Sequence, residues 1–319
     1  MATRRYHIIF NPAAGTAHSM GLTTAALGGH FTDAGLDFTM DDDDELPLAE
    51  RVGRALAGDA DVIVAAGGDG TVLSVAEALV GSDKILAVLP LGTLNGLARD
   101  IGLALDLPGA IAQLAALEPR AIDVAEVNGR PFLHNVIVGL IPDIAVGREL
   151  IRGKEAGWRT RVRFVRFMWR RMTYAHRIAL ALRSDVSATR IELVQSLVVA
   201  NNSYDQRIGS FMARRRLDRG TMTAYLIRSL RMRDALRLAV SMFAGRWRAD
   251  EVIEYEKVRE LRVQSKRKRV LVTMDGEVTR LDTPLNFRIW PRSLQVLAPP
   301  EPAATPETAT PAVPALMGA

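Results

Sequence analysis

Cysteine is absent from this chain of 319 residues. Its absence excludes disulfide bonds, thiolate metal sites and a cysteine nucleophile, and it is typical of proteins from a reducing compartment. Long hydrophobic runs are missing too, since none reaches the roughly 18 residues of a membrane-spanning helix, so we expect any membrane contact to be peripheral. With 48% hydrophobic and 24% charged residues, the composition excludes wholesale disorder and a collagen-like fibre.

The two signs of charge are unevenly distributed along the chain. Residues 1–130 hold 8 basic and 18 acidic residues, whereas residues 131–319 hold 33 basic and 18 acidic residues. The modest total of +5 therefore hides an acidic first part and a strongly basic second part. Such asymmetry indicates that the second part meets an anionic partner, either nucleic acid or an acidic membrane face.

The first third of the chain alternates apolar runs with helical patterns. Three runs predict strands, each ending in a turn rich in glycine or proline: His7–Phe10, Val62–Ala66 and Ile85–Leu89. Helical periodicity occurs at Thr23–Ala34, Leu48–Ala57 and Val72–Leu79. Nearly continuous apolar strands separated by helices predict a parallel sheet that is covered on both faces. Ligands of such sheets bind beyond the carboxyl ends of the strands, so the turns there are the places to look for chemistry.

After about Ile122 the pattern changes to strands with few helices between them. The predicted strands are Ile122–Val127, Pro131–Val138, Ile178–Leu182, Ile191–Ala200, Thr221–Ile227, Val258–Gln264, Val270–Met274 and Leu285–Ile289. We therefore expect an α/β domain over residues 1–125 and an antiparallel β-sandwich over residues 126–297, whose last strand could return to the first domain. The stretch 298–319, rich in proline, alanine and threonine, predicts a disordered tail.

The strongest local motif is Gly67-Gly68-Asp69-Gly70-Thr71, which lies between a predicted strand and a predicted helix. Glycines let the backbone approach a ligand closely, and the N-terminus of the helix presents free N–H groups to phosphate oxygens. A glycine-rich turn that merely closes the crossover is the plain alternative. The carboxylate of Asp69 favours a phosphate site that also holds Mg²⁺ or a proton to be abstracted, because it would otherwise repel the anion.

Two more turns after strands belong with this motif. The stretch FNPAAG occupies residues 10–15, and PLGTLNGLARD occupies residues 90–100. If adjacent parallel strands supply all three turns, then Asn11, Gly15, Thr93 and Asn95 converge with the GGDGT amides on one crevice. Taken singly, Asn11 is an ordinary turn residue and Thr93 a helix cap, so their joint spacing carries the prediction.

Several widespread nucleotide-binding signatures do not occur in the chain. The GxxxxGK[ST] loop and the HRD and DFG motifs of protein kinases are missing, and residues 67–72 do not meet the strict GxGxxG pattern. The motifs that do occur, in this order, are FNPAAG, GGDGT, PLGTLNGLARD and MDGE at residues 274–277. Together they resemble the diacylglycerol kinase catalytic-domain family of lipid kinases, which includes bacterial diacylglycerol kinases and the sphingosine and ceramide kinases.

The resemblance covers about residues 6–297 and implies a fold and an active site. It implies an α/β first domain (a parallel sheet, like that of NAD kinases and phosphofructokinases), a β-sandwich second domain, and ATP in the cleft between them. The residues implied in nucleotide binding are Asn11, Gly15, Gly67, Gly68, Asp69, Gly70, Thr71, Ser74, Thr93 and Asn95. The resemblance further implies that Glu277 and Asp275 lie beside the transferred phosphate, with Glu277 favoured as the base, while Asp69 and Asp275 serve Mg²⁺ and orientation.

A structural metal site is also implied. The segment ending at Gly220 resembles a Leu-Asp-Asp-Gly turn of the family, which makes Asp218 and the carbonyl groups of Thr221 and Thr223 the implied Mg²⁺ ligands; a plain β-turn is the alternative. Two departures from the family pattern bear on the metals. Arginine replaces the proline and the second aspartate before Gly220, and Gly96 replaces an aspartate near the cleft, which leaves room for weak activity or an unusual substrate.

One segment of the second part combines apolar and basic residues at helical spacing. Residues 147–183 hold 11 basic and 2 acidic residues. Within them, one apolar stripe recurs at intervals of four and three residues: Trp158, Val162, Val165, Trp169 and Met172. A helix over 157–173 with arginines around such a stripe suits an anionic lipid interface, and packing of the stripe on the sandwich is the alternative.

These observations predict an ATP- and Mg²⁺-dependent lipid kinase, with diacylglycerol as the leading acceptor and phosphatidic acid as the product. The alternatives are a kinase for a sphingoid base or another long-chain alcohol, a non-catalytic nucleotide- or lipid-binding regulator, and an NAD-kinase-like enzyme that shares GGDGT. Nucleic-acid binding is disfavoured because the known recognition motifs are missing. We expect a cytoplasmic protein at the inner face of the membrane, with a homodimer as one oligomeric alternative.

Overall fold

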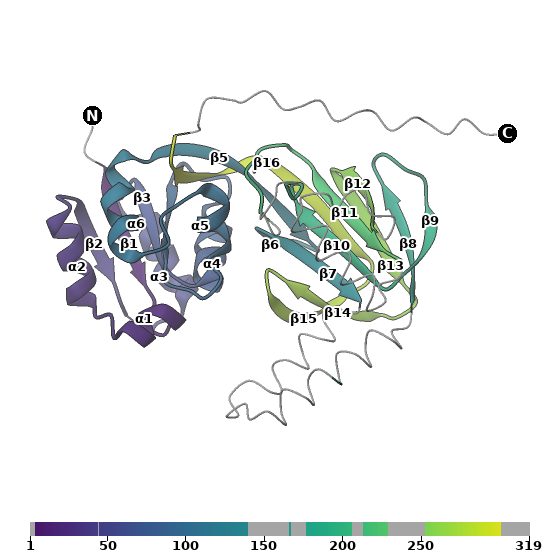
Figure 1. Ribbon diagram of the computed structural model, residues 1–319, viewed down its shortest axis with the longest axis horizontal. Coiled ribbons are helices and arrows are strands. Elements are labelled where there is room, and N and C mark those ends of the chain that lie inside the picture. The colour runs from purple at the N-terminus through teal and green to yellow at the C-terminus, as the bar shows by residue number, and fades with distance from the viewer. Residues whose placement is uncertain are drawn as a thin grey trace.

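A computed structural model gives the structure of this chain and describes residues 4–43, 45–139, 166, 177–205, 213–228 and 253–300. Two bodies lie side by side, a first with helices around a sheet and a second built of strands (Figure 1). The expected basic helix over 157–173 lies outside the described residues except for Arg166, as do residues 301–319 of the expected tail.

The sheet of the first body consists of parallel strands in the order β2-β1-β3-β4. Their bounds are β1 (Arg5–Phe10), β2 (Asp37–Asp41), β3 (Val62–Gly67) and β4 (Ile85–Pro90). All six residues of β3 are buried, which fits a strand of valine, isoleucine and alanine at the centre of a two-sided layer. The edge strand β2 was not predicted, because Asp37-Phe-Thr-Met-Asp is short and largely polar.

Six short helices follow or separate these strands. They are α1 (Gly15–Met20), α2 (Thr24–Asp33), α3 (Leu48–Ala57), α4 (Asp69–Leu79), α5 (Gly96–Ile101) and α6 (Leu107–Gln113), with a 3₁₀ turn η1 (Leu114–Ala116) after them. Side chains cap two of them: the Thr23 hydroxyl accepts from the N–H of Ala26, and Asp106 accepts from the N–H of Gly109. By contrast, the residue before α4 is Gly68, which has no side chain to cap the helix.

The second body is a sandwich of antiparallel strands. One layer is a six-stranded sheet in the order β12-β11-β10-β7-β14-β15. Its strands are β7 (Asn135–Gly139), β10 (Ser196–Asn201), β11 (Met222–Ile227), β12 (Ile253–Val258), β14 (Arg269–Met274) and β15 (Glu277–Asp282). The other layer holds β5 (Glu118–Val127), β6 (Arg130–Phe132), β8 (Ile178–Ser184), β9 (Arg190–Val194), β13 (Glu260–Ser265) and β16 (Leu285–Ala298).

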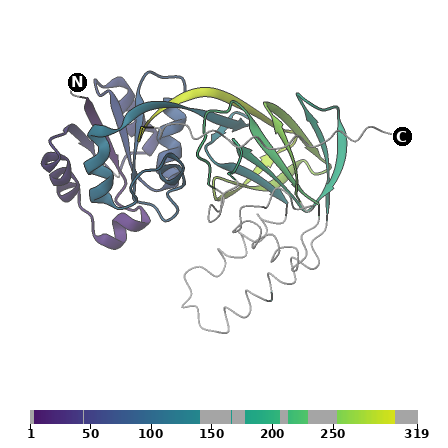
Figure 2. The same cartoon turned by 45° about the horizontal axis from the view of Figure 1, so that its top comes forward.

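The long strand β16 belongs to both bodies. Its first residues pair with β13 in the sandwich, whereas Gln295 and Val296 pair in parallel with β4 of the first body. Figure 2 shows this yellow strand arching across the two, with β5 beside it. An irregularity between Trp290 and Leu294 interrupts its pairing with β5. The ten-stranded sheet is therefore parallel at one end and antiparallel at the other.

The predicted fold class is confirmed: an α/β first domain is followed by an antiparallel sandwich. Two predicted strands are each divided in the structure. The run 131–138 is interrupted at Leu133 and His134, and the run 191–200 is interrupted at Gln195. Among the described residues, no helix is long and apolar enough to span a membrane.

Candidate active site

The glycines of the GGDGT turn permit two backbones to touch. A Cβ atom on Gly92, in the turn after β4, would lie 2.7 Å from the Cα of Gly68, in the turn after β3. A Cβ atom on Gly67 would lie 2.6 Å from the Cβ of Thr71. Since real side chains do not tolerate such approaches, both turns require glycine at these positions. The two turns together frame the uncapped N-terminus of α4, which suits an anion.

Asp69 ties the first turn of α4 to the start of α5. Its carboxylate accepts the N–H groups of Asn95 (3.1 Å) and Gly96 (2.7 Å). The side chain of Asn95 in turn accepts from the N–H of Gly92 (2.8 Å) and donates to the carbonyl of Pro90 (3.2 Å), while its backbone is left-handed (φ 50°). Asn95 thus shapes the loop between β4 and α5, and its amide is engaged within that loop.

The remaining nucleotide-binding candidates of the first domain surround the same turns. The amide of Asn11 donates to the hydroxyl of Thr71 (3.1 Å). The hydroxyl of Thr93 lies 3.3 Å from the place where a Cβ atom of Gly15 would stand. The structure thus brings the post-strand turns of β1, β3 and β4 together, as adjacent parallel strands require.

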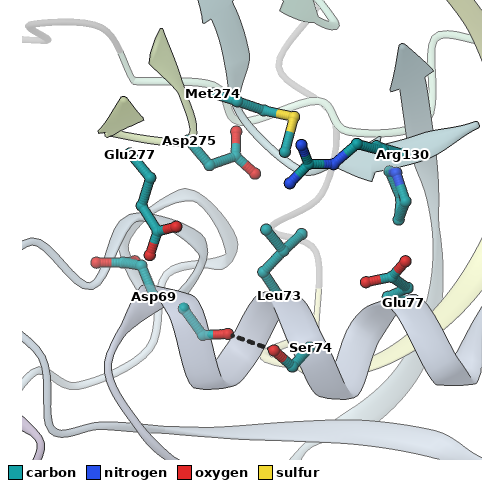
Figure 3. A pocket seen from close by; sticks show the side chains of 10 residues that line it. Asp69, Leu73, Ser74, Glu77, Arg130, Met274, Asp275 and Glu277 are labelled. Carbon is teal, nitrogen blue, oxygen red and sulfur yellow. Dashed lines mark hydrogen bonds between the residues drawn. The ribbon is translucent and has the colours of Figure 1, made fainter. Parts of the chain in front are cut away.

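A pocket opens between α4 of the first domain and two hairpins of the second. It encloses about 680 Å³, including the solvent at its mouth, and ten residues line it: Asp69, Gly70, Leu73, Ser74, Glu77, Arg130, Pro131, Met274, Asp275 and Glu277. Figure 3 shows the carboxylates of Asp69 and Glu277 pointing toward each other across the domain boundary. A Glu277 carboxylate oxygen also lies 3.3 Å from the place of a Cβ atom on Gly70, while the Ser74 hydroxyl donates to the carbonyl of Gly70 (3.0 Å).

Asp275 stands in the tight turn that joins β14 to β15. Both Asp275 (φ 47°) and Gly276 (φ 91°) adopt left-handed backbone, as a two-residue hairpin turn requires. The Asp275 carboxylate accepts three N–H groups, from Leu133 (2.7 Å), His134 (2.8 Å) and Asn135 (3.0 Å). Asp275 therefore anchors the turn between β6 and β7 while it lines the pocket, and it leaves Glu277 as the more accessible carboxylate.

A buried ion pair behind the pocket was missed in the sequence. The guanidinium of Arg214, 1% exposed, donates to Asp100 and to the carbonyls of Leu133 (2.7 Å) and Asn201 (2.6 Å). Although burial opposes the charge of Asp100, the neighbouring Arg214 holds the pKa of that carboxyl below its usual value. Arg214 is the first residue of a run of three arginines, a pattern typical of a solvated surface, so its burial could not be predicted from the sequence.

Gly96, one of the departures noted in the sequence, lies against a histidine. A Cβ atom on Gly96 would come within 2.7 Å of two ring atoms of His134. Arg214 donates to Nδ1 of this imidazole. The imidazole therefore occupies the space into which a side chain at position 96 would project, and an aspartate there would displace it.

The implied metal ligand Asp218 is paired with arginines in this structure. The Asp218 carboxylate accepts from the guanidinium of Arg216 (2.9 Å) and lies 3.7 Å from that of Arg292. Its pKa is lowered, chiefly by the hydrogen bond from Arg216. Thr221 precedes β11, and Thr223 lies within β11 between β10 and β12. Two guanidinium groups at the carboxylate repel a cation, so this arrangement does not fit Mg²⁺.

Asp123 holds this turn instead, and it too was missed. Its fully buried carboxylate accepts the N–H groups of Gly220 (2.6 Å) and Arg292 (2.9 Å). An aspartate inside the apolar run of β5 was the signal that could have revealed it, because buried carboxylates need partners. In the described parts of the chain, no group of three or more histidine, aspartate or glutamate side chains is placed to hold a metal ion.

Two family models match this chain, one on each domain. The model of the diacylglycerol kinase catalytic domain matches residues 5–127. The model of the YegS C-terminal NAD kinase beta sandwich-like domain matches residues 156–298. The two matches begin with the first strand and end with the last, and residues 128–155 lie between them.

Curated proteins and solved structures point in the same direction. The probable lipid kinase YegS-like of Pseudomonas savastanoi pv. phaseolicola is 47% identical over 85 residues, which are 26% of this chain and 28% of that protein. Its counterpart from Pseudomonas aeruginosa is 44% identical over 98 residues, which are 30% and 31% of the two chains. The matched stretch thus spans less than a third of these relatives.

Two solved structures from Bacillus anthracis str. Sterne share the fold over nearly the whole chain. A diacylglycerol kinase superposes with a TM-score of 0.65 at 19% identity, covering 94% of this chain and 98% of that one. A putative diacylglycerol kinase gives a TM-score of 0.68 at 19% identity, covering 93% and 96%. At this identity the likeness establishes the architecture.

Proposed function

We propose that this chain transfers the γ-phosphoryl group of ATP to a hydroxyl group of a lipid. The reason is that it belongs to the diacylglycerol kinase catalytic-domain family of lipid kinases. One observation carries the proposal. The Glu277 carboxylate reaches from the second domain to Gly70, at the N-terminus of α4. A candidate base is thereby held against a candidate phosphate cradle, which is the GGDGT turn at residues 67–71 with the N-terminus of α4.

The cradle is the chain's main contribution to ATP binding. Free N–H groups in the first turn of α4 and its positive dipole end favour phosphate oxygens, and the glycines keep side chains out of their way. Asn11 and Thr93 lie at the rim of the same turns, where they would contact the nucleotide. Asp69 keeps the loops after β3 and β4 together through its two backbone hydrogen bonds.

The cleft carboxylates fit Mg²⁺ better than the turn at Asp218 does. Mg²⁺ in kinases is held by one or two carboxylates together with substrate phosphates and water. Asp69 and Glu277 face each other beside the cradle, and none of the ion pairs found among the described residues involves either of them. The Asp69 carboxylate would hold the ion together with phosphate oxygens and water, which leaves Glu277 to accept a proton. The ion neutralises phosphate charge when bound.

Glu277 is the proposed base. Phosphoryl transfer needs an aligned acceptor more than covalent assistance, so a carboxylate that orients the hydroxyl and accepts its proton completes the chemistry. Asp275 is the lesser candidate because its oxygens already accept three N–H groups. We assign Asp275 a positioning role, in which it keeps the β14–β15 turn and the β6–β7 turn in register at the pocket.

We propose diacylglycerol as the acceptor, with a sphingoid base or another long-chain alcohol as the alternative. Such acceptors keep their acyl chains in a bilayer, so the enzyme must work at its surface. The excess of basic over acidic residues in the second part of the chain supports attraction to an anionic leaflet. We therefore propose that the enzyme works at the inner face of the membrane.

The test is a panel of acceptors incubated with γ-labelled ATP and Mg²⁺. Diacylglycerol, sphingosine, a long-chain alcohol and NAD are offered to the wild-type chain and to Glu277→Gln. We expect label on diacylglycerol with the wild type and almost none with the variant. Label on NAD alone would move the protein to the NAD-kinase class. ATP binding without label on any acceptor would make it a regulator.

A matched binding experiment addresses the partner. Anionic vesicles of phosphatidylglycerol and duplex DNA are compared at the same salt concentration, because both respond to the same basic residues. We expect binding to the vesicles. Equal or stronger binding to DNA would contradict the membrane proposal.

A further inference from the structure

One cation stands among the ten described residues that line the pocket. Four of the ten are carboxylates, and the only basic side chain is that of Arg130. Figure 3 shows its guanidinium pointing into the pocket from the second domain, toward Met274 and Asp275 and opposite α4. Any nucleoside triphosphate that enters this pocket meets four carboxylates and this single arginine.

The backbone that carries Arg130 is firmly held. Arg130 follows the turn of Asn128 (φ 50°) and Gly129 (φ 76°), which joins β5 to β6. Asn128 donates its N–H to the carbonyl of Asn286 (3.0 Å) and its amide to the carbonyl of Asp282 (2.9 Å), and it accepts the N–H of Asn286 (2.8 Å). The hairpin is thereby fastened to β15 and β16, so the position of the Arg130 Cα is fixed relative to Glu277.

The guanidinium, in contrast, is not held by any of the described residues. Within the part of the chain that the structure describes, the Arg130 side chain forms no hydrogen bond or ion pair, although Glu77 and Asp275 line the same pocket. Arg214 differs, because its guanidinium serves Asp100 and two backbone carbonyls. A structural arginine has its donors used in this way. Arg130 keeps five N–H donors in a planar fork, the geometry that matches a phosphate group.

We propose that Arg130 binds the phosphoryl group that is transferred, from the side opposite the α4 cradle. This rests on the proposed function. In the step, the acceptor hydroxyl oxygen forms a bond to the γ-phosphorus while the bond from that phosphorus to the bridging oxygen breaks, and ADP leaves with the electron pair. The acceptor proton goes to Glu277. Arg130 stays protonated throughout and donates to the non-bridging oxygens, whose charge it balances.

A terminal phosphoryl group is present both on ATP, where it is an anhydride, and on the phosphorylated product, where it is a monoester. Arg130 therefore distinguishes ATP from ADP, and it binds the phosphorylated lipid more tightly than the free alcohol. The first consequence tests whether Arg130 binds the phosphate of the nucleotide, and the second tests whether it binds the phosphate of the lipid. The first consequence can be measured without turnover.

The experiment uses the full chain as wild type, Arg130→Ala, Arg130→Lys and the matched control Arg262→Ala. Arg262 is an exposed arginine of β13 that does not line the pocket. Dissociation constants of Mg·ATP and Mg·ADP are measured by calorimetry, and inhibition by phosphatidic acid and kcat are measured with the best acceptor.

We expect Arg130→Ala to weaken ATP about tenfold, to leave ADP within about twofold, to weaken phosphatidic acid, and to lower kcat by roughly 10²–10³-fold, the usual loss for one donor to transition-state charge. Arg130→Lys should recover part of each loss, because it keeps the charge without the fork. Arg262→Ala should match the wild type.

Equal losses for ATP and ADP, no loss for either, or the same losses in Arg262→Ala would overturn the inference. Folding is checked by thermal unfolding, and Arg130→Lys carries the test if Arg130→Ala unfolds. A wild-type chain that binds ATP more tightly than ADP but phosphorylates no lipid defeats the proposed function, while the ATP–ADP comparison still decides on Arg130. A wild-type chain that binds neither nucleotide defeats both.

Discussion

Asp69 and Asp218 each stand in a glycine-containing turn, and their surroundings differ. The Asp69 carboxylate accepts two backbone N–H groups, which are neutral donors. The Asp218 carboxylate accepts from Arg216 and lies near Arg292, which are cations. Neutral donors orient a carboxylate and leave its charge available, whereas guanidinium groups cancel it. The partners of a carboxylate, more than its presence in a motif, therefore decide whether a cation fits beside it.

Among the predicted substitutions, that of Glu277 in the cleft should have the largest effect on kcat. Glu277→Gln should lower kcat by roughly 10²–10⁴-fold, because the amide cannot accept the proton of the acceptor. The dissociation constant of ATP should stay within about twofold, which separates chemistry from binding. Glu254→Gln, on exposed β12, is the matched control and should retain wild-type kcat. Wild-type turnover in Glu277→Gln would transfer the base role to Asp69 or Asp275.

Asp69 and Asp218 can be compared directly by the same substitution. Asp69→Ala should lower kcat by roughly 10²–10³-fold and raise the Mg²⁺ concentration needed for activity, because it removes both a cleft charge and the anchor of the loop after β4. Asp218→Ala should change kcat less than about twofold and leave the Mg²⁺ dependence unaltered. Steady-state kinetics over a Mg²⁺ titration give both quantities. Equal losses in the two variants would erase the distinction between the sites.

Gly92→Ala tests whether the close contact between the turns after β3 and β4 is needed for ATP binding. The added Cβ would lie 2.7 Å from the Cα of Gly68 and 2.9 Å from a side-chain oxygen of Asn95, so the two turns must separate. We expect ATP to bind about tenfold more weakly, and the melting temperature to fall by about 2–4 °C for each kcal/mol lost. The control is Gly29→Ala in α2, where a Cβ meets nothing within 4 Å; its melting temperature should hold or rise. If Gly92→Ala binds ATP as tightly as the wild type, the close contact between Gly92 and Gly68 does not shape the cradle.

The smallest effect concerns the stability of the turn at Asp218. The hydrogen bond from Arg216 lowers the pKa of Asp218, so its ionised form stabilises the fold above the unfolded pKa of about 3.9, and this contribution is lost as pH falls through the lower folded pKa. Because Arg216 is half exposed, Asp218→Asn should reduce the unfolding free energy by less than about 1 kcal/mol at neutral pH.

Urea unfolding of wild type and Asp218→Asn at neutral pH and at about pH 3 measures this difference, which should shrink at the lower pH. Added Mg²⁺ should have the same effect on the melting temperature of the wild type and on that of Asp218→Asn. A stabilisation by Mg²⁺ that is lost in Asp218→Asn would restore the metal interpretation of this turn.

The sequence predicted those parts of the site that depend on neighbours along the chain. The strand before Gly67 and the helix after Asp69 follow from a local apolar run and a local periodicity, so the place of the GGDGT turn was predictable. The contact of the Asp275 carboxylate with the N–H groups of Leu133 and His134 was not, because more than 130 residues separate the partners. Such contacts depend on how the sandwich closes, which no local pattern encodes.

Strands at the edges of sheets, and the ends of strands, were also difficult to predict from the sequence. The strand β12 (Ile253–Val258) reads Ile-Glu-Tyr-Glu-Lys-Val and is largely exposed, so its composition does not indicate a strand. β16 extends nine residues beyond the predicted Leu285–Ile289, through Trp290 and Pro291, where the pairing with β5 is irregular. Proline and bulges interrupt the alternation by which strands are recognised.

The return of β16 to β4 has a consequence for how this protein can be divided or recombined. The side chains of Leu294, Val296 and Leu297 complete the core of the first domain, although nearly all of the second domain lies between them and the rest of that core in the chain. A gene fragment that ends near residue 130 would encode a sheet with a hydrophobic edge left open. Fusion, shuffling or split-protein designs must therefore treat the sandwich as an insertion within the first domain, and keep residues 294–298 with the amino-terminal half.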